Sequence, residues 1–369
     1  MFYFSKKRMI FFAKIILFPL VLLNKIKLKK SLITSEYLAR VENTRNNIID
    51  NSNKDYVAFY NNNWLGVTSA TKELFENLID CGELYRKKDI KQIGNIILKS
   101  DIKQVIFSSF AIGWKDLAIY LKKHNKNIKI KAYWHGSHSQ ILDTYGWQRN
   151  KEIISLHNKK IIDAIATCKE SLVNFYKKEG YNAYFLTNKV TLTKTSKKER
   201  KDSKIVIGLY AAKCDDWRKN MFSQMAAISL IKGAVIDMVP LNETAVGFAK
   251  ILNVKIKGTK EALSREKLID RMSKNSLNLY VTYSECAPML PLESMENGVI
   301  CITGNNHHYF KGSELEKYII VNNEEDVVEI KKKMEYALKN SEKIIKLYND
   351  FSEKNKKDAE KLVNDFLKK

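Results

Sequence analysis

The stretch that decides the fold is residues 279–304, which read LYVTYSECAPMLPLESMENGVICITG. Its first three residues are apolar or aromatic, and they predict a short buried strand. Pro288 and Pro291 suit the first turn of the helix that follows, and Asn297-Gly298 suits its end. A second buried strand is expected over residues 299–303. The stretch therefore predicts a strand–helix–strand unit of a parallel sheet.

Two carboxylates lie in this unit at a fixed spacing. Glu285 follows the first strand, and Glu293 lies eight residues further on, inside the helix. Ligands of open parallel sheets bind beyond the carboxyl ends of the strands. We therefore expect Glu285 to lie at a binding site.

The remainder of the chain predicts more units of the same kind. Its 369 residues suit two domains of about 150 residues each. Strand-forming runs alternate with helical ones on both sides of a Lys-, Thr- and Ser-rich linker, so the expected fold class is α/β, with two facing Rossmann-like domains. The expected division is a basic, apolar membrane-associating segment over 1–30, a first domain over 31–187, a linker over 188–204, a second domain over 205–345 and a C-terminal helix over 346–369.

The expected elements can be placed by residue number. Besides the two in the opening stretch, strands are expected over 56–60, 105–110, 128–134, 161–166, 183–186, 205–210, 235–239 and 254–256. Helices are expected over 31–49, 70–79, 114–122, 171–178, 220–230, 244–252 and 265–272. The charged tail over 324–369 is expected to be helical and long enough to pack back across the first domain.

Residues 1–30 combine charge with apolarity. Two lysines and an arginine at 6–8 precede the run 9–23, which is apolar except for Lys14, and more lysines follow. A spanning helix needs about 20 apolar residues, and Pro19 interrupts this shorter run. The pattern favours a segment in the membrane interface with its lysines on anionic head groups; a signal-anchor span and an ordinary buried element are the alternatives. We expect a cytoplasmic protein, peripheral on the inner face of the cell membrane.

The charge balance favours partners that carry phosphate. Lysine and arginine number 64 against 41 acidic residues, a formal net charge of +23. Nucleic acid, anionic lipid and phosphorylated small molecules all suit such a charge, and compositional drift is the other source of it. The sequence has no platform of interleaved aromatic and basic residues, so nucleic acid is not expected as a partner.

The sequence argues against several kinds of site. Its five cysteines are scattered with no C-x-x-C pair, which disfavours a disulfide framework or a zinc site and favours a reducing compartment. No D-x-D pair, H-E-x-x-H motif or glycine-rich phosphate loop occurs. Neither a metal nor a cofactor is therefore expected.

Two other places carry candidate site residues. Arg218 and Lys219 lie just before an expected helix, and a helix N-terminus with two cations suits a diphosphate; a solvated basic turn is the alternative. His135 ends an expected strand, where it can position or polarise a substrate hydroxyl or accept a proton; a structural histidine is the alternative.

The opening stretch resembles the E-x7-E signature of the retaining glycosyltransferases of family 4, also called group 1. The matching positions are Glu285, Pro288, Glu293 and Gly298. Val281-Thr282 stands where that family usually has Pro-Ser, and Ser294 stands where it usually has alanine. The resemblance implies the GT-B fold, in which two Rossmann-like domains face each other.

The resemblance also implies catalytic roles for two residues. Glu285 would hold hydroxyls of the transferred sugar. His135 matches a cleft histidine that lies near the sugar hydroxyls, where donor and acceptor meet. The resemblance further implies retained configuration at the anomeric carbon, with the leaving phosphate taking the acceptor proton. No glutamate need be the nucleophile.

Five residues would bind the donor by the same resemblance. Glu293 would hold the ribose of the nucleotide, and Met289 and Leu290 would lend backbone N–H groups to the sugar or the phosphates. Arg218 and Lys219 match the basic pair that neutralises the leaving diphosphate.

The expected function is a metal-independent, retaining glycosyltransferase of cell-surface polysaccharide synthesis. It would move a sugar from a nucleotide-diphosphate sugar to a glycan or lipid-linked acceptor. A nucleotide-sugar epimerase of similar fold is one alternative, and it would convert the donor with no acceptor present. A non-enzymatic basic protein that binds membranes is the other, and it would not need the Glu285/Glu293 spacing.

Overall fold

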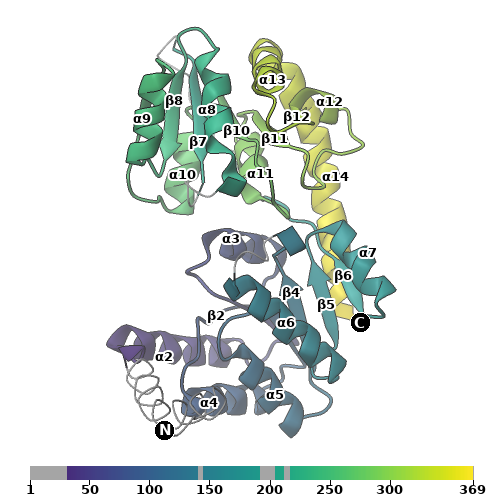
Figure 1. The fold of residues 1–369 in the computed structure, drawn as a ribbon. Coiled ribbons are helices and arrows are strands. Elements are labelled where there is room, and N and C mark those ends of the chain that lie inside the picture. The colour runs from purple at the N-terminus through teal and green to yellow at the C-terminus, as the bar shows by residue number, and fades with distance from the viewer. Residues whose placement is uncertain (1–30, 140–143, 192–203, 212–216, 369) are drawn as a thin grey trace, which may run out of the picture.

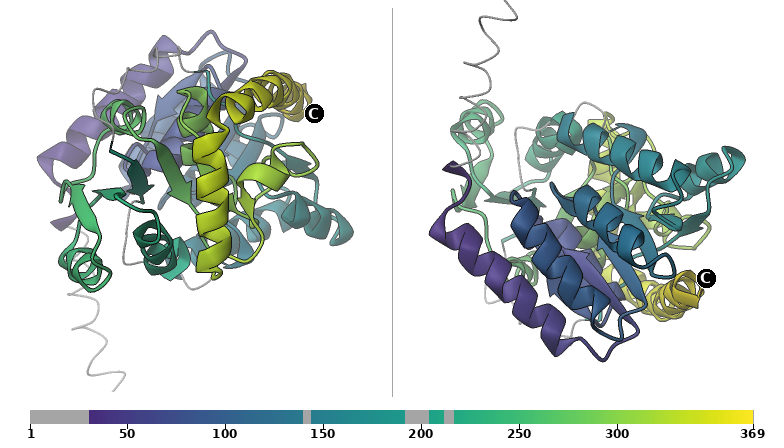
Figure 2. Two further views of the ribbon diagram at one scale, coloured as in Figure 1. Left: turned by 90° about the horizontal axis from the view of Figure 1, so that it is seen from above. Right: turned by 90° about the horizontal axis from the view of Figure 1, so that it is seen from below.

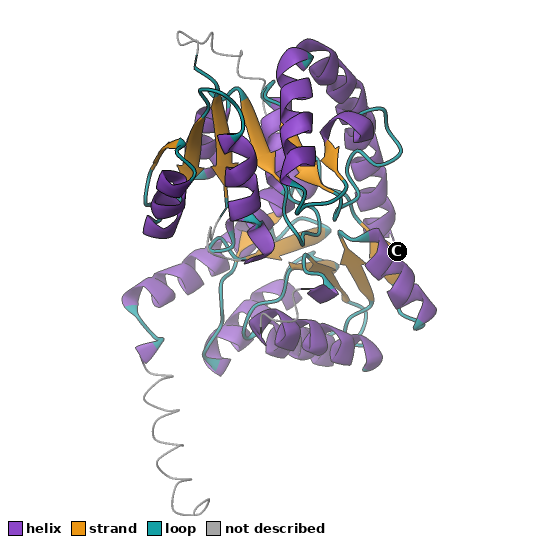
Figure 3. Ribbon diagram, turned by 45° about the horizontal axis from the view of Figure 1, so that its top comes forward, coloured by secondary structure: helices purple, strands orange, loops and turns teal. Residues whose placement is uncertain are grey.

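The computed structural model describes residues 31–139, 144–191, 204–211 and 217–368, and the expected membrane-associating segment over 1–30 lies outside them. The described strands form two six-stranded sheets in which every pairing is parallel. Each sheet belongs to its own domain and has helices against its faces (Figures 1 and 3). The prediction of an α/β protein with two Rossmann-like domains is confirmed.

The first sheet has the strand order β2-β1-β3-β4-β5-β6. Its strands are β1 (Tyr56–Tyr60), β2 (Leu78–Asp80), β3 (Gln104–Ser108), β4 (Lys129–Trp134), β5 (Ala164–Thr167) and β6 (Ala183–Phe185). The helices of this half are α2 (Ser35–Asp50), α3 (Leu65–Leu74), α4 (Lys87–Leu98), α5 (Trp114–His124), α6 (Thr144–Asn158) and α7 (Glu170–Lys178).

The second sheet has the strand order β12-β11-β10-β7-β8-β9. Its strands are β7 (Val206–Tyr210), β8 (Val235–Val239), β9 (Lys255–Gly258), β10 (Leu277–Tyr280), β11 (Cys301–Gly304) and β12 (Ile320–Val321). Its helical elements are the short turn η2 (Trp217–Lys219), α8 (Met221–Ser229), α9 (Glu243–Ile251), α10 (Arg265–Met272), α11 (Met289–Glu296), α12 (Glu316–Ile319), α13 (Val327–Lys339) and α14 (Ser341–Lys368).

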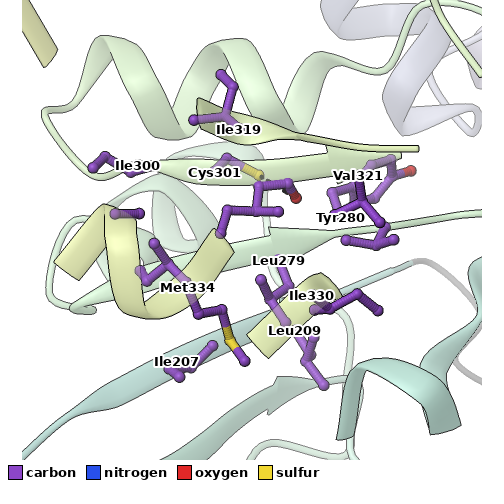
Figure 4. Packing of buried hydrophobic residues seen from close by; sticks show 14 of the residues in the cluster. Ile207, Leu209, Leu279, Tyr280, Ile300, Cys301, Ile319, Val321, Ile330 and Met334 are labelled. Carbon is purple, nitrogen blue, oxygen red and sulfur yellow. Dashed lines mark hydrogen bonds between the residues drawn. The ribbon is translucent and has the colours of Figure 1, made fainter. Parts of the chain in front are cut away.

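The core of the second domain explains why the opening stretch folds as it does. All four residues of β10 are buried, because the strand lies between β7 and β11 in the middle of the sheet. Ile207, Leu279 and Ile302 are among the apolar side chains that pack there, and Met334 of α13 covers them (Figure 4). Gly298 ends α11 with a φ of 76°, a backbone conformation that glycine adopts without strain.

One predicted helix was wrong. Residues 70–79 were expected to be a single helix, but α3 ends at Leu74, and Leu78–Asp80 form β2 beside β1. Phe75 has extended backbone, which stops the helix and lets its apolar ring enter the core between α3 and β2. Helices α4 and α6 and strand β12 had not been assigned from the sequence at all.

The predicted tail crosses both domains. The helix expected over 346–369 is part of α14, which begins five residues earlier, at Ser341. Its first half packs in the core of the second domain through Ile344 and Tyr348. Its last turns cover one face of the first sheet through Val363 and Phe366 (Figures 1 and 2). The expectation that the tail packs back across the first domain is confirmed.

No helix within the described ranges is long and apolar enough to cross a membrane.

A buried lysine receives the C-terminal end of α14. The side chain of Lys131 on β4 is fully buried, and its Nζ donates to the backbone oxygens of Phe366, at 2.5 Å, and Leu367, at 3.1 Å. These carbonyls belong to the last turn of a helix, where a cation is favoured. Burial lowers the pKa of Lys131 to about 8, and the nearby charge of Lys129 adds to the effect.

Replacing Lys131 with methionine tests this contact. Lys131→Met keeps an unbranched apolar stem but removes the donor, so the two carbonyls lose their partner. We expect the free energy of unfolding to fall by about 1–3 kcal/mol, the cost of unsatisfied buried polar groups. Amide hydrogen exchange over residues 359–368 should accelerate. Lys129→Met, at an exposed position of the same strand, is the control. Unchanged exchange in Lys131→Met would contradict the role given to Lys131.

Candidate active site

A cleft of about 660 Å³ lies between the two domains, at the carboxyl edges of both sheets. The strand order reverses between β7 and β10 in the second sheet and between β1 and β3 in the first, and ligands of open parallel sheets bind at such points. Of the seven residues predicted for the site, those that line the cleft are His135, Lys219, Glu285, Met289, Leu290 and Glu293.

Glu285, Lys219 and Tyr280 form a compact charged cluster on the second-domain side. The Nζ of Lys219 donates to Oε1 of Glu285 and, at 2.9 Å, to the hydroxyl oxygen of Tyr280. The Tyr280 hydroxyl donates to the same carboxylate oxygen at 2.9 Å. Since the two charged side chains are only 15% and 13% exposed, the pair is largely shielded from water.

The backbone around this cluster is fixed by contacts from both domains. Asn220, in the left-handed conformation after η2, donates from its side chain to the oxygen of Val281 at 3.1 Å. Lys169 of the first domain donates from Nζ to the backbone oxygen of Glu285 at 3.2 Å, and Asn188 donates to that of Ala287 at 2.9 Å. The loop that carries Glu285 is therefore held at the domain boundary.

Lys219 carries its positive charge in spite of its burial. Burial alone would lower the pKa of its ammonium group, because a charged amine is poorly solvated there. The neighbouring Tyr280 and Glu285 outweigh that effect and raise the pKa of Lys219 above its ordinary value. The cleft thus contains a permanent cation beside Glu285.

Glu293 lies in a second charged cluster, which joins the domains. Arg265, the first residue of α10, donates from Nε to Oε1 of Glu293 at 2.6 Å and from Nη2 to Glu73 of α3 at 2.8 Å. Burial raises the pKa of Glu293, and Arg265 opposes that rise. The predicted ribose-binding residue is therefore paired with an arginine.

Two helices point their N-termini into the cleft. The first residues of α11, Met289 and Leu290, line it, and so do Leu65 and Gly66 at the start of α3. Backbone N–H groups of a first helical turn have no partner within the helix, and they favour an anion. The α3 terminus was not singled out from the sequence as a helix start, because the helix was expected to begin at residue 70.

His135 follows β4 on the opposite wall, and its tautomer can be deduced. Thr71 donates its one hydroxyl proton to the backbone oxygen of Val67 at 2.7 Å, so in its 2.6 Å contact with Ser108 it accepts. Ser108 then has no proton left for His135, whose Nε2 lies 2.8 Å away and must therefore donate. Burial lowers the pKa of His135 to about 3. The ring is thus neutral, with Nδ1 as a hydrogen-bond acceptor.

Arg218 stands apart from the other predicted residues. It is half-buried on η2, and it is not among the described residues that line the cleft. Its backbone oxygen accepts from Tyr283 at 2.8 Å, which fixes the turn that carries Lys219. Of the basic pair, Lys219 lines the cleft and pairs with Glu285.

Arg265, Tyr280 and Lys72 are among the cleft residues that sequence reasoning missed. Arg265 was assigned only as the start of a helix, and Tyr280 only as part of a strand. A usable signal existed for Tyr280, since it is the last residue of the strand that precedes Glu285. Arg265 is distinguished only by the acidic partners that the fold brings to it.

Among the described residues, no group of three or more histidine, cysteine, aspartate or glutamate side chains is placed to hold a metal ion.

Comparison with known proteins finds similarity at the level of structure. No protein-family model matches the chain, and no curated protein does. A UDP-forming α,α-trehalose-phosphate synthase from Burkholderia xenovorans superposes with a TM-score of 0.54 at 11% identity, over 78% of this chain and 79% of that one. A sucrose-phosphate synthase from Thermosynechococcus elongatus gives 0.54 at 10% identity, over 84% and 94%.

A third similar structure is a mutant of TarM from S. aureus, in complex with fondaparinux, alpha-GlcNAc-glycerol and UDP. Its TM-score is 0.52 at 15% identity, over 76% of this chain and 58% of that one. At these identities the likeness establishes the fold: this chain has the two-domain GT-B architecture that the E-x7-E resemblance implied.

Two further histidines lie in the loop after β11, where His307 is buried and His308 is half-buried. His307 is 3% exposed, and neither of its ring nitrogens has a hydrogen-bond partner within the described structure. Burial lowers the pKa of His307 to about 3 and that of His308 to about 4. Both rings are therefore neutral in the folded protein at neutral pH.

The lowered pKa of His307 predicts a loss of stability in acid. Between the folded pKa of about 3 and the unfolded value of about 6.5, the unfolded chain binds more protons, so stability falls as pH falls. Within that window, His307→Leu should reduce the slope of unfolding free energy against pH by up to about 1.4 kcal/mol per pH unit. Chemical denaturation at pH 4.5, 5.5 and 6.5 measures the slope, and His124→Leu, at an exposed position of α5, is the control. Equal slopes in wild type and His307→Leu would show that His307 protonates freely in the folded state.

Proposed function

We propose that this protein is a retaining, metal-independent glycosyltransferase that moves a sugar from a nucleotide-diphosphate sugar to a glycan or lipid-linked acceptor. The observation that carries the proposal is the joint presence, in one interdomain cleft, of a desolvated Lys219–Glu285 pair and two helix N-termini. A diphosphate needs cations and N–H donors, and a sugar needs a carboxylate that accepts from its hydroxyls. The cleft supplies both within one site.

The donor would lie mainly against the second domain. Its diphosphate would bind Lys219 and the first N–H groups of α11, at Met289 and Leu290. Glu285 would accept hydrogen bonds from hydroxyls of the transferred sugar, and Glu293 from the ribose. Because Glu293 uses one carboxylate oxygen for Arg265, the ribose would bind the other oxygen or displace the arginine.

The reaction would proceed by departure of the diphosphate. The bond between the anomeric carbon and the phosphate oxygen breaks, and its electron pair stays on the diphosphate. Lys219 and the helix N-termini stabilise that growing charge, an electrostatic contribution that is often the largest in catalysis. The acceptor hydroxyl attacks the anomeric carbon from the same face, and its proton passes to the leaving phosphate oxygen. The products are the glycosylated acceptor and the nucleoside diphosphate, with retained configuration.

The acceptor would approach from the first domain, beside His135. Nδ1 of the neutral His135 ring is an acceptor by the tautomer argument, so it suits a sugar hydroxyl at the reaction centre. The expected location on the inner face of the cell membrane remains a proposal, since it rests on residues 1–30, which lie outside the described ranges. A lipid-linked or membrane-surface acceptor would fit that location.

A thermal-shift screen with UDP, GDP, ADP and CDP tests the donor site. At least one nucleotide should raise the unfolding temperature of the wild type, because a ligand that binds only the folded state stabilises it. The Lys219→Met variant should show no such increase in unfolding temperature, because it lacks the ammonium group that would bind the diphosphate. Glu285→Gln should keep the shift but lower kcat by about 100-fold or more, because Glu285 would contact the sugar and not the nucleotide.

The matched control is Lys267→Met, which removes the same charge from an exposed position of α10 outside the cleft. No shift with any of the four nucleotides would overturn the donor site. Conversion of the donor to an isomeric donor with no acceptor present would point instead to the epimerase alternative.

Two replacements of His135 distinguish the acceptor role of Nδ1 from the structural contact that Nε2 makes with Ser108. Glutamine places its amide near Nε2 and can keep donating to Ser108, but it has no acceptor at the Nδ1 position. Asparagine places an amide oxygen near Nδ1 and gives up the contact with Ser108. We expect kcat/KM for transfer to fall about tenfold more in His135→Gln than in His135→Asn, the effect of one hydrogen bond of about 1.4 kcal/mol. The reverse order would mean that His135 acts through Ser108 alone.

A further inference from the structure

A second pocket opens on the far side of His135, within the first domain. Its volume is about 260 Å³, and it shares His135 with the large cleft. This volume lies below the range of about 300–1,000 Å³ that pockets for drug-sized ligands span, so it suits a single ring. Its walls include Trp64, Trp134, Tyr145, Trp147 and Arg149.

The aromatic walls suit the apolar face of a sugar ring. Trp64 and Tyr145 meet edge to face, with ring centroids 6.0 Å apart, and Trp147 is 46% exposed. The indole of Trp134 lies directly over the backbone of Gly136, because a Cβ there would fall 2.5 Å from the ring. Glycine at 136 thus leaves space for an aromatic wall beside His135. Such faces attract the polarised C–H groups on one side of a pyranose.

Arg149 adds a positive charge to the pocket, and one of its nitrogens has no hydrogen-bond partner within the described structure. Its Nη1 donates to Glu152 at 2.7 Å, and its guanidinium lies 5.2 Å from the centre of the Tyr145 ring. Its Nε is buried and has no hydrogen-bond partner within the described structure. An unmatched buried donor costs stability, so a ligand group is expected to meet it.

The free nitrogen defines the chemistry of that ligand group. Nε and one N–H of Nη2 point in parallel and form the edge of arginine that binds a carboxylate or a phosphate with two hydrogen bonds. The contact with Glu152 uses the other nitrogen, Nη1, and does not engage Nε. Nearby, Lys115 also pairs with Glu152, at 3.8 Å, so the three side chains together retain one positive charge.

The geometry points to a specific acceptor class: a sugar ring that carries an acidic group, either a carboxylate or a phosphate, with that group on the side-on edge of Arg149. The ring lies against the tryptophan walls, and a hydroxyl of the ring faces His135 and the donor cleft. This inference rests on the proposed glycosyl transfer, and it adds that an anionic substituent selects the acceptor. Arg149 is then the residue that determines specificity.

Binding of glucose, glucuronate, glucose 6-phosphate and inorganic phosphate to the full chain tests this inference. Intrinsic fluorescence suits the measurement, because Trp64, Trp134 and Trp147 line the pocket. The wild type should bind glucuronate or glucose 6-phosphate at least tenfold more tightly than glucose, and the better of the two identifies the acidic group. Equal affinity for glucose, or binding of inorganic phosphate as tight as that of the better sugar, would overturn the inference.

Variants with opposite expected effects separate the anion contact from damage to the fold. Arg149→Gln should abolish the preference for the acidic sugar, whereas Glu152→Gln should strengthen it, because it removes the competing carboxylate. Lys151→Gln removes a positive charge from an exposed position of α6 outside the pocket and should change the preference less than twofold. A preference that survives in Arg149→Gln, or that weakens in Glu152→Gln, would contradict the assignment.

Nucleotide binding by the same samples distinguishes the two proposals. If nucleoside diphosphates bind while Arg149→Gln leaves the sugar preference unchanged, the acceptor inference fails and the glycosyltransferase proposal stands. If the acidic sugar binds through Arg149 while none of the four nucleoside diphosphates binds, the pocket stands and the glycosyltransferase proposal fails.

Discussion

The arrangement of the site depends on one helix, α14, that holds another helix and a strand in place. Glu296, near the end of α11, accepts hydrogen bonds from Tyr348, Ser352 and Lys356 of α14, at 3.2, 2.9 and 2.7 Å. The opposite end of α14 rests on Lys131 of β4. The α11 helix presents its N-terminus to the cleft, and His135 directly follows β4, so α14 joins the two walls of the cleft. Because a packed helix is stiff, this connection fixes the distance across which donor and acceptor would meet.

The charged groups in the cleft are better explained by ligand binding than by a contribution to folding stability. Taking ionised side chains out of water is costly, and a buried ion pair often contributes little or nothing to net stability. The cleft nevertheless contains the Lys219–Glu285 pair and the Arg265 bridge between Glu293 and Glu73. Such groups, already desolvated and oriented, need little rearrangement to stabilise charge that develops on a substrate. The bridge to Glu73 also links the domains, so a ligand that engages Glu293 would act on the contact between them.

Much of the fold and of the candidate site was predictable from the sequence. The elements and residues that were missed have identifiable physical causes. The unit from β10 to β11 is encoded locally by its apolar runs, two prolines and Gly298, so the positions of Glu285, Glu293, Met289 and Leu290 followed from it. β2 was missed because three residues beside an apolar helix end carry too little pattern of their own. Arg265 has no local signature, since its partners Glu73 and Glu293 lie far away in sequence. A dipeptide likewise does not reveal that Lys219 lines the cleft while Arg218 is not among the described residues that line it.

The central claim is that a nucleoside diphosphate binds between Lys219 and the start of α11. Methyl NMR on methionine-labelled protein tests it directly, because Met289 lines the cleft, whereas Met334 lies fully buried in the core of the second domain. Titration with UDP, GDP, ADP and CDP should, for at least one of them, move the Met289 methyl resonance and leave that of Met334 in place. A Met289 resonance that stays fixed with all four nucleotides, in a folded protein, would contradict the account.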